Sequence, residues 1–272
     1  MERRLEEKRN ALATILLKMG GCVIGFSGGV DSTLLFAVAA ATLGDRALAV
    51  TATSETYPER ELREAQALAG LLGGRHRVIV SEELEIPGFT KNPVDRCYHC
   101  KKELFGKLRT IADAEGIADV VDGSNLDDRS DYRPGRVALA ELGVRSPLEE
   151  ARFTKADIRA LSRELGLTTW DKPAFACLSS RFPYGTEITR EKVSQVGRAE
   201  ERLRELGLRV LRVRHHGDVA RIELGSEEFT LVVNELRDEV VRRVKAAGYA
   251  YVALDLQGYR TGAMNEVLEV TP

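Results

Sequence analysis

A chain of 272 residues has room for one large or two small domains, each with a buried core. Hydrophobic residues make up 43% and charged residues 30% of the chain, which is ordinary for a soluble globular protein. The formal net charge of -2 gives no general attraction to nucleic acid or to a membrane surface.

The N-terminal residues 1–9 are densely charged and contain no apolar core of a signal peptide. The apolar stretch near them at residues 36–41 is far too short to span a bilayer. These features predict a cytoplasmic protein with no membrane partner.

Strands and helices alternate regularly in the first part of the chain. Periodicity predicts helices over residues 2–19, 30–43 and 59–72, and short buried strands over residues 22–26, 47–52 and 77–80. Strands that alternate with helices in this way form a parallel sheet covered on both faces. The sequence therefore predicts an α/β domain.

The pattern changes after the third predicted strand. Proline, glycine and asparagine make residues 86–96 a loop by composition. The elements expected next are a helix, a strand, a polar loop and a second helix, over residues 101–115, 119–122, 123–135 and 154–165. Thr154 is the expected N-cap of the last of these helices, with Asp157 three residues on.

A second, smaller module begins near Ser180. Its expected elements are a helix capped by Thr189, two strands, a long amphipathic helix and a last strand, over residues 189–206, 208–214, 219–224, 227–247 and 251–256. His215 and His216 fall in the turn between the two strands and are interpreted as ordinary surface histidines. A contact with a substrate phosphate is the alternative for this pair.

A glycine-rich loop joins the first predicted strand to the helix that follows it. The loop comprises Ser27, Gly28, Gly29, Val30, Asp31 and Ser32. Two glycines let the backbone approach an anion closely, and the N–H groups of the helix N-terminus point at that anion. The two serine hydroxyls can add donors, whereas Asp31 would face a phosphate only across a divalent cation and is a candidate Mg²⁺ contact. A tight strand-to-helix turn that uses glycine only for its geometry is the alternative.

The loop lacks the lysine of the Walker motif, so cleavage between the β- and γ-phosphates of ATP is not the expected chemistry. The hexapeptide 27–32 resembles the PP-loop of ATP pyrophosphatases, a superfamily that includes the GMP, NAD and asparagine synthetases and the tRNA sulfur-transfer enzymes. The resemblance implies cleavage between the α- and β-phosphates, through an AMP ester and with pyrophosphate as product. As the candidate Mg²⁺ contact, Asp31 is expected to be a catalytic residue.

Two further polar segments follow predicted strands, where open α/β sheets bind ligands. The segment with Thr51, Thr53 and Ser54 follows the second strand and is a candidate to contact adenosine. Asp127 and Asp128 lie in the loop after the fourth strand and are candidates to lie near Mg²⁺ and the nucleotide. A solvated loop is the alternative for these two aspartates.

The chain has four cysteines, Cys22, Cys97, Cys100 and Cys177. In a reducing cytoplasm, structural disulfides are not expected. The close spacing of Cys97 and Cys100 directs attention to metal or redox chemistry. Structural zinc, for which His99 is an awkwardly placed fourth ligand, and a reversible pair of thiols are both open. Cys22 begins a buried strand and is assigned to the core.

Four stretches of the chain look like the LarE family of ATP-dependent sulfur transferases, which build the nickel-pincer cofactor of lactate racemase. They are residues 92–101 (NPVDRCYHCK), 122–128 (DGSNLDD), 172–185 (KPAFACLSSRFPYG) and 258–266 (GYRTGAMNE), so the resemblance covers essentially the whole chain. It implies that ATP, with Mg²⁺, adenylates a carboxylate of pyridinium-3,5-biscarboxylate mononucleotide. Sulfur then replaces AMP to give a thiocarboxylate.

The resemblance places the sulfur-delivering role on Cys177. Some members of the family have only this cysteine and sacrifice its sulfur, which leaves dehydroalanine, whereas others have three cysteines that hold a [4Fe-4S] cluster. Because Cys97 and Cys100 accompany Cys177, the chain resembles the cluster type. Three thiolate ligands leave one iron open for sulfide from an external sulfur donor.

The resemblance also implies the fold class and the assembly. The fold is α/β, with a parallel-sheet PP-loop domain like that of adenine nucleotide alpha hydrolases over residues 1–179. A smaller α+β C-terminal domain over residues 180–272 is expected to serve substrate binding and oligomerisation. The expected assembly is a homo-oligomer, either a trimer or a hexamer.

A mononucleotide substrate with carboxylates and a phosphate calls for arginines. Arg181, Arg214 and Arg260 are the candidates because each lies in a segment that resembles the family. A surface salt bridge is the alternative for each of them. Glu201 and Glu223 are candidates for a further substrate or metal site in the second module, or else belong to an exposed helix and strand face.

Two other classes of function remain open. Another PP-loop enzyme would follow adenylation by tRNA thiolation or amidation. A tRNA would favour a strongly basic face, which the net charge does not indicate, and amidation would need an ammonia source. A non-catalytic module that binds a nucleotide or a metal is the second class, and the intact loop at residues 27–32 argues against it.

Overall fold

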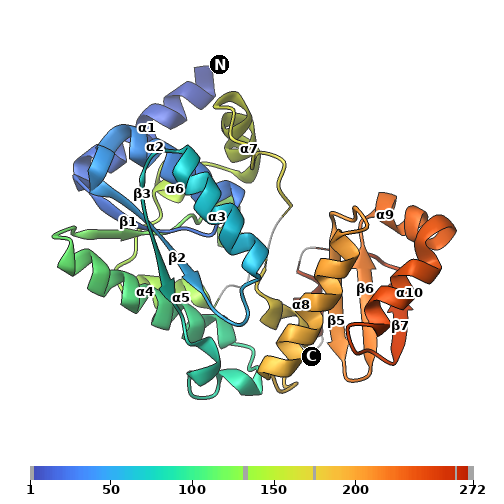
Figure 1. Ribbon diagram of the computed structural model, residues 1–272. Coiled ribbons are helices and arrows are strands. Elements are labelled where there is room, and N and C mark those ends of the chain that lie inside the picture. Colours follow the sequence, from blue (N-terminus) through green and yellow to red (C-terminus); the bar gives the residue numbers. More distant parts are fainter. Residues whose placement is uncertain (1–2, 131–133, 174–175, 261, 269–272) are drawn as a thin grey trace. The chain divides into compact units, whose positions relative to one another are not determined.

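The computed structural model describes residues 3–130, 134–173, 176–260 and 262–268 (Figure 1). The chain divides into two compact units. The first comprises Met1–Glu83 and Asp95–Phe175, and the second comprises Leu84–Val94 and Ala176–Pro272. The expected domain boundary after residue 179 stays a prediction, because a compact unit in space need not be a domain that folds alone.

The first unit is built on a four-stranded parallel sheet. Its strands are β1 (Cys22–Gly25), β2 (Ala47–Thr53), β3 (Arg75–Val80) and β4 (Asp119–Val121). The strand order is β3-β2-β1-β4, and Cys22 pairs with Ala47 on one side and with Asp119 on the other. The parallel α/β architecture predicted for this part of the chain is confirmed.

Helices cover both faces of this sheet because successive strand residues point to opposite sides. Ile24 of β1 packs in one apolar cluster with residues of five helices, and its neighbour Val23 packs in another cluster with residues of two helices. On the first face lie α1 (Arg3–Met19), α2 (Val30–Leu43), α3 (Glu59–Leu71), α6 (Pro147–Glu150) and α7 (Lys155–Glu164); on the second lie α4 (Arg96–Ala114) and α5 (Gly135–Glu141).

The strand order fixes where a ligand can bind. From β1 the chain moves through β2 to β3 on one side, and then returns to place β4 on the other side of β1. The loops that leave β1 and β4 therefore start next to each other at the carboxyl end of the sheet, at the switch point where open α/β sheets bind ligands. The loop at residues 27–32 leaves β1 at this point.

The predicted helix starts are confirmed where a capping residue marks them. Thr154 and Asp157 form a capping box at the start of α7, in which each side chain accepts from the backbone of the other residue. The short helices α5 and α6 (Pro147–Glu150) were not predicted. The prediction of a helix from residue 101 was also wrong at its start, because α4 begins at Arg96.

The second unit contains a three-stranded mixed sheet with helices. Its strands are β5 (Leu211–His216), β6 (Val219–Leu224) and β7 (Tyr251–Leu254), in the order β5-β6-β7. The first pair is antiparallel and the second pair parallel. Its helices are α8 (Arg190–Arg204), α9 (Ser226–Leu231) and α10 (Arg237–Lys245), with a π-helical turn over Val232–Leu236 joining the last two. The predicted α+β module is confirmed.

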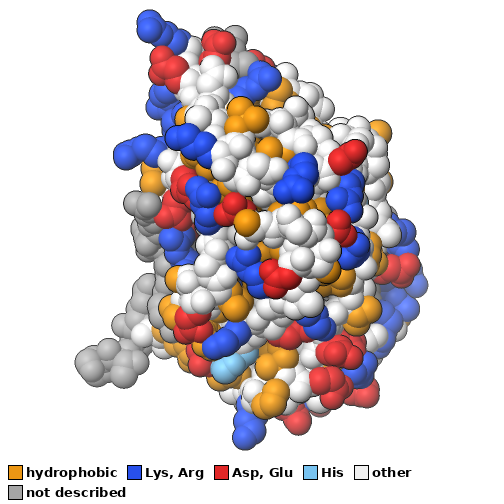
Figure 2. Space-filling view, turned by 90° about the vertical axis from the view of Figure 1, so that its left-hand side faces the viewer, with side chains coloured by type: hydrophobic (Ala, Val, Ile, Leu, Met, Phe, Trp, Pro, Cys, Tyr) orange, Lys and Arg blue, Asp and Glu red, His pale blue; other side chains and the backbone are white. Residues whose placement is uncertain are grey.

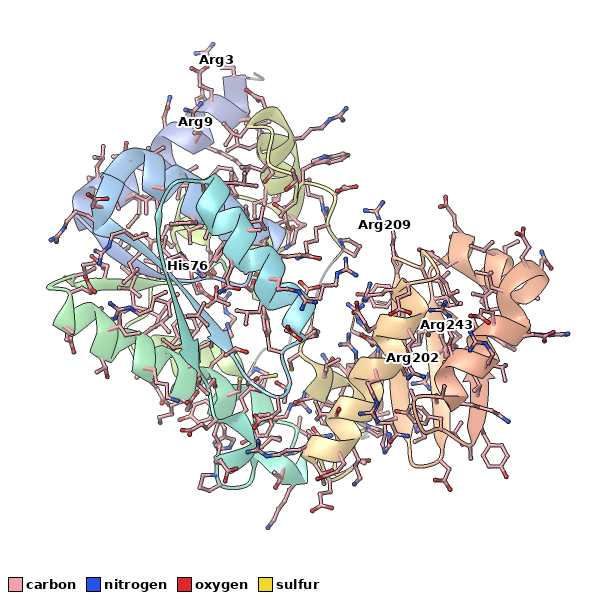
Figure 3. All side chains as sticks on the ribbon, in the orientation of Figure 1. Arg3, Arg9, His76, Arg202, Arg209 and Arg243 are labelled. Atoms are coloured by element: carbon pink, nitrogen blue, oxygen red, sulfur yellow. The ribbon has the colours of Figure 1, made fainter. Side chains whose placement is uncertain are left out.

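Side chains tie α8 to α10 in this unit. The guanidinium of Arg243 donates to the carbonyl oxygen of Arg202 at 2.9 Å, and Arg202 donates to the carbonyl oxygen of Arg243 at 3.4 Å (Figure 3). Short 3-10 helices complete the described secondary structure, at Gly44–Arg46, Glu83–Glu85, Phe89–Lys91, Leu126–Ser130, Leu178–Arg181 and Ala263–Leu268. In the described ranges no helix is both long enough and apolar enough to cross a membrane.

The interpretation of both turn histidines as surface residues was wrong for His215. Both histidines belong to β5, and the side chain of His215 is buried. Its ring lies 5.1 Å from the ring of Phe182 and 5.7 Å from that of Tyr249, whose hydroxyl is 3.1 Å from Nδ1. Burial lowers the pKa of His215 because it disfavours the charged imidazolium. His216 is exposed, as predicted.

Candidate active site

The glycine-rich loop leaves β1 and opens α2 without a side-chain cap. Gly29 is the N-cap residue, has extended backbone angles and provides no side-chain cap hydrogen bond to the first turn. The hydroxyls of Ser27 and Ser32 lie 3.2 Å apart, and the backbone N–H of Gly29 points to the Ser27 hydroxyl at 3.4 Å. The backbone N–H groups and two hydroxyls at this helix N-terminus can bind an anion such as pyrophosphate.

Two glycines allow the close approaches that shape this loop. Gly28 has φ +65°, and a Cβ atom there would lie 3.2 Å from Ala65 on α3. Gly123, in the loop that follows β4, lies so close to α2 that a Cβ atom would be 3.1 Å from the backbone nitrogen of Ser32. The loops that leave β1 and β4 therefore meet at the switch point of the sheet.

Asp31 stands at the centre of a charged cluster. The ammonium of Lys155 contacts both of its carboxylate oxygens, at 2.6 and 2.5 Å, and the side-chain amide of Asn125 donates to it at 3.3 Å. Lys155 is the first residue of α7, and its backbone N–H donates to the carboxylate of Asp127 at 2.8 Å. The cluster thus gathers side chains from the two sheet loops and from the start of α7.

The donor chemistry of this cluster fits a divalent cation. Carboxylate oxygens are the ligands that Mg²⁺ prefers, and Asp31 already attracts the ammonium of Lys155 as a cation. Asp31 is the contact that the sequence predicted for this ion. The assignment of Mg²⁺ to Asp31 stays a prediction.

The predicted adenosine contacts lie at the end of β2. The hydroxyl of Thr51 is buried, donates to the carbonyl oxygen of Phe26 at 2.8 Å and lies 2.9 Å from Nε2 of His76 on β3 (Figure 3). Thr51 therefore supports the chain that enters the glycine-rich loop. Thr53 and Ser54 are half-buried, and the Ser54 hydroxyl lies 3.2 Å from that of Thr56. Their contact with adenosine stays a prediction.

The two predicted aspartates of the loop after β4 hold that loop in shape. Asp128 is buried and accepts from the backbone N–H of Asn125 at 3.0 Å, while the side-chain oxygen of Asn125 accepts from the N–H of Asp127 at 3.0 Å. The Asp127 carboxylate also accepts a hydrogen bond from the backbone N–H of Lys155 on α7. Both residues thereby fix the position of Asn125 beside Asp31.

The cysteine pair lies inside α4 and not in the loop before it. Cys97 is exposed and Cys100 is half-buried, three residues further along the first turn, so both side chains lie on one side of the helix. The Cys100 thiol lies 3.1 Å from the buried carboxylate of Glu83. Cys22 is fully buried in β1, as predicted, and burial raises the pKa of its thiol to about 12.

Cys177 belongs to the second unit and directly precedes a 3-10 helix over Leu178–Arg181. The guanidinium of Arg181 donates to the carbonyl oxygen of Cys177 at 3.3 Å and forms two hydrogen bonds to Glu200, at 2.7 and 3.0 Å. Arg181 is fully buried and Glu200 nearly so. The buried ion pair therefore fixes the backbone that carries Cys177.

A cavity of about 330 Å³ lies in the second unit beside this segment. Arg214 lines it, donates twice to the buried carboxylate of Glu223, at 2.9 and 2.7 Å, and donates to the carbonyl oxygen of Ser180 at 2.7 Å. Arg221 also lines the cavity and lies 3.3 Å from Glu223. Other lining residues are Arg181, Phe182, Pro183, Tyr184, His216 and Met264.

The remaining predicted substrate residues of the second unit differ in exposure, and the exposed strand face considered for Glu223 is wrong because this side chain is buried. Arg260 is half-buried and pairs with Glu266 at 2.8 Å. Glu201 is exposed on α8, whereas Glu223 is buried on β6. Over the described ranges, no group of three or more histidine, cysteine, aspartate or glutamate side chains is arranged to hold a metal ion. A site that uses Glu201 and Glu223 stays a prediction.

Three residues of the charged loop region were missed by sequence reasoning. Lys155 and Asn125 contact Asp31, and Lys172 contacts the carbonyl oxygen of Gly28 at 3.3 Å. A signal existed for two of them, since Asn125 and Lys172 lie in stretches that resemble the LarE family. Lys155 follows the N-cap Thr154, and nothing in its local sequence marks it as part of a site.

Comparison with known proteins extends over both units. The NAD synthase family matches residues 8–90. An uncharacterized protein from Synechocystis is 46% identical over 265 residues, which cover 97% of this chain and 99% of that protein. The pyridinium-3,5-bisthiocarboxylic acid mononucleotide synthase of Lactiplantibacillus plantarum is 43% identical over 267 residues, which cover 97% of this chain and 96% of that enzyme. An uncharacterized protein from Methanocaldococcus jannaschii is 29% identical over 239 residues, covering 88% of this chain and 90% of that protein.

Proposed function

This chain belongs to the LarE family of PP-loop ATP-dependent sulfur transferases, and from that premise we propose that it adenylates a carboxylate of pyridinium-3,5-biscarboxylate mononucleotide and replaces AMP by sulfur. The observation that carries the proposal is the uncapped start of α2 beside the cluster of Asp31 and Lys155. That arrangement offers donors for a pyrophosphate leaving group and a carboxylate for its cation. The relative from Lactiplantibacillus plantarum is named for its product, pyridinium-3,5-bisthiocarboxylic acid mononucleotide, which is a thiocarboxylate.

In the first step, a carboxylate oxygen of the substrate attacks the α-phosphorus of ATP. The bond from that phosphorus to the bridging oxygen breaks, and pyrophosphate leaves with the electron pair. The N–H groups at the start of α2 and the hydroxyls of Ser27 and Ser32 would bind the departing pyrophosphate. Lys155, together with Mg²⁺ on Asp31, would neutralise its growing charge. The carboxylate is left as an acyl adenylate.

In the second step, a sulfur nucleophile attacks the acyl carbon and AMP leaves. The carbon–oxygen bond breaks, so the former carboxylate oxygen departs on AMP and a carbon–sulfur bond takes its place. If Cys177 itself attacks, a thioester forms, and loss of its Cα proton with cleavage of the Cβ–S bond leaves dehydroalanine. If sulfide attacks, the thiocarboxylate forms directly and Cys177 stays intact. Neither route needs an external oxidant or reductant.

The three cysteines suit an iron–sulfur cluster by their donor chemistry. Thiolates are the preferred ligands of such clusters, and the two sulfurs of Cys97 and Cys100 lie on one side of the first turn of α4. We propose Cys97, Cys100 and Cys177 as ligands of a [4Fe-4S] cluster. When bound by three thiolates, the cluster would supply an open iron for sulfide. Structural zinc and the sacrificial use of Cys177 are the competing assignments.

The cavity of the second unit is the proposed place for the phosphate or a carboxylate of the mononucleotide. Arg214 and Arg221 both line it, and their guanidinium groups share the carboxylate of Glu223. Arg221 forms a second ion pair with Asp255. Guanidinium groups match phosphate and carboxylate geometry, and fixing them beforehand on buried carboxylates lowers the entropy cost of binding.

Replacing Arg214 by lysine should weaken use of the mononucleotide about tenfold to a hundredfold while leaving ATP affinity unchanged, because a charge-assisted contact contributes about 1.5–3 kcal/mol. Lysine keeps the positive charge opposite Glu223. Its single ammonium cannot offer the planar set of N–H donors with which a guanidinium binds the Glu223 carboxylate and a substrate oxyanion together. Steady-state kinetics with varied mononucleotide, together with ATP binding by calorimetry, measure the two effects. Arg242→Lys, at an exposed arginine on α10, is the matched control.

An equal loss of ATP affinity in the Arg214→Lys variant would contradict the assignment of the cavity to the mononucleotide. Alanine is avoided at this position because it would remove two hydrogen bonds from the buried carboxylate of Glu223 and so destabilise the unit.

The distribution of surface charge argues against the alternative hypothesis of a tRNA substrate. On the face presented in Figure 2, lysines and arginines are interspersed with aspartates and glutamates, and no broad basic patch stands out. A phosphate backbone would favour such a patch. We therefore propose a small-molecule substrate. The cytoplasmic location and the trimeric or hexameric assembly stay predictions.

Product analysis tests the proposed function. The protein, supplied anaerobically with ATP, Mg²⁺, sulfide and the mononucleotide, should release AMP and pyrophosphate in equal amounts and form a thiocarboxylate. Release should depend on the mononucleotide. Formation of ADP with orthophosphate would contradict the proposal.

A further inference from the structure

Two cations of α1 hold the first turn of α7, beside which α1 passes (Figure 1). The ammonium of Lys8 contacts the carboxylate of Asp157 at 2.5 Å and the carbonyl oxygen of Arg152 at 2.6 Å. The guanidinium of Arg4 pairs with the same carboxylate. The side chain of Lys8 is 19% exposed and that of Asp157 only 2%, so solvent screens this ion pair little.

Asp157 is also part of the capping box that starts α7. Its carboxylate accepts from the backbone N–H of Thr154 at 3.0 Å and from the Thr154 hydroxyl at 2.6 Å. Burial alone would raise the pKa of Asp157, but hydrogen bonds from Lys8, Thr154 and Arg4 hold that pKa well below its usual range. The carboxylate is therefore charged, and it joins the start of α7 to α1.

The loop after β4 holds the same segment. The backbone N–H of Leu126 donates to the carbonyl oxygen of Phe153 at 2.8 Å, and the carboxylate of Asp127 accepts from the backbone N–H of Lys155 at 2.8 Å. The side chain of Phe153 is fully buried in the apolar cluster of this face of the sheet. Residues 152–157 are therefore fixed by α1 and by this loop at once.

The backbone of this turn decides where the ammonium of Lys155 lies. Lys155 is the first residue of α7, and its side chain, which is 40% exposed, contacts both carboxylate oxygens of Asp31. A long, half-exposed lysine has many rotamers, and only some of them reach a given carboxylate. A displacement of the helix start by about 1 Å can therefore cost as much as about a hundredfold in rate.

We propose that Lys8 is a positioning residue for adenylation. Through Asp157 and Arg152 it fixes the first turn of α7, and that turn places the ammonium of Lys155 at Asp31. Lys8 itself touches neither the nucleotide nor the mononucleotide. All of these contacts lie within the first unit. The inference rests on the proposed function for the role of Lys155, which is to neutralise the charge that grows on the departing pyrophosphate.

Lys8→Met is the first variant of the test. It removes the ammonium but keeps an unbranched apolar side chain near the ring of Phe153, whose centre lies 5.8 Å from the Lys8 ammonium. Asp157 keeps both of its hydrogen bonds to Thr154, so α7 should still form. The kcat of pyrophosphate formation should fall about tenfold while KM for ATP changes less than about twofold, because Lys155 acts on charge that develops in the transition state. Lys8→Arg keeps the charge and should restore most of the rate.

A double variant separates positioning from a general loss of structure. Lys155→Met lacks the ammonium that Lys8 is proposed to place, so adding Lys8→Met should lower kcat by less than about a further twofold. A merely structural role would lower kcat by the same factor in both backgrounds. The matched control is Lys107→Met, since Lys107 likewise contacts a carboxylate, that of Glu103 at 2.5 Å, and a carbonyl oxygen, that of Val80 at 2.9 Å. This control should keep wild-type kinetics.

Chemical labelling of Lys155 measures its position without turnover. An amine-specific acetylating reagent is added to protein free of ATP and Mg²⁺, and mass spectrometry follows the peptide that contains Lys155. The ion pair with Asp31 protects the amine, so labelling should be about threefold faster in Lys8→Met than in the wild type and unchanged in Lys107→Met. Lys8→Gln, which can still donate to the carbonyl oxygen of Arg152, replaces Lys8→Met if that variant does not fold, and its effects should have the same sign.

Four results would overturn the inference, each in Lys8→Met or in Lys8→Gln where that variant replaces it. Unchanged labelling shows that the position of Lys155 does not depend on Lys8, and unchanged kcat shows that this position does not matter for the rate. An equal loss of kcat in the Lys155→Met background makes Lys8 a structural residue. A rise in KM for ATP as large as the fall in kcat makes Lys8 a residue for nucleotide binding.

Failure of the proposed function gives a different result. A wild-type chain that forms no AMP and pyrophosphate with the mononucleotide contradicts the proposed function itself. The labelling experiment needs no turnover, so it still decides whether Lys8 places Lys155.

Discussion

Replacing Asp31 by asparagine should lower the rate of pyrophosphate formation by at least about a hundredfold, which is the usual cost of removing one preorganised electrostatic contact from an active site. Asparagine keeps the shape of the side chain but not its charge. It can neither hold the proposed Mg²⁺ next to the pyrophosphate nor place the ammonium of Lys155, which contacts both carboxylate oxygens of Asp31. The measurement is pyrophosphate release at saturating ATP and mononucleotide.

Two further variants make the Asp31 experiment specific. Asp113→Asn makes the same chemical change at an exposed position near the end of α4 and should keep full activity. The double variant Asp31→Asn, Lys155→Met should be far less impaired than the product of the two single effects, because residues that act as one unit are not additive. Wild-type activity in Asp31→Asn would place Asp31 outside the site.

Alanine at Cys97, Cys100 or Cys177 should abolish repeated turnover with sulfide in the reconstituted protein. The reason is that a cluster held by three thiolates loses a ligand in each variant, and a purely sacrificial mechanism would need only Cys177. Thiocarboxylate formed per chain, together with the intact mass of the protein after turnover, gives the readout. The wild type should make more than one product per chain and keep its mass.

Cys22→Ala is the control for the cysteine series. Cys22 is fully buried in β1, so its replacement costs some stability but should leave sulfide-dependent turnover in place. The cluster assignment fails if the wild type ends with dehydroalanine at position 177 after one turnover while Cys97→Ala and Cys100→Ala remain active. The sacrificial mechanism would then stand.

Local sequence patterns predicted the helices and strands of the first unit because glycine turns and helix caps mark where several of them begin. The helix at residues 30–43 follows directly from two glycines after a short apolar strand, and α2 has these bounds. The cap at Thr154 was predicted from two residues, and its hydrogen bonds are present. The start of α4 was missed because Pro93 and the polar residues after it read as a loop, although the chain turns helical at Arg96.

The contacts inside the site were beyond local patterns. Lys155 meets Asp31 across 124 positions of sequence, and Lys172 meets Gly28 across 144. The sheet order brings the loops after β1 and β4 together, and the packing of α7 with α2 in one apolar cluster brings Lys155 to them. His215 shows the same limit in the second unit, since its burial depends on the rings of Phe182 and Tyr249 from other elements.

The most direct test of the central claim follows an oxygen atom. The mononucleotide is prepared with a heavy oxygen isotope in its carboxylates and is turned over with ATP, Mg²⁺ and sulfide. Attack of this carboxylate on the α-phosphorus, followed by displacement of AMP at the acyl carbon, predicts that the heavy oxygen appears in AMP. Its appearance in orthophosphate, or AMP without the label, would contradict adenylation of the substrate carboxylate by this enzyme.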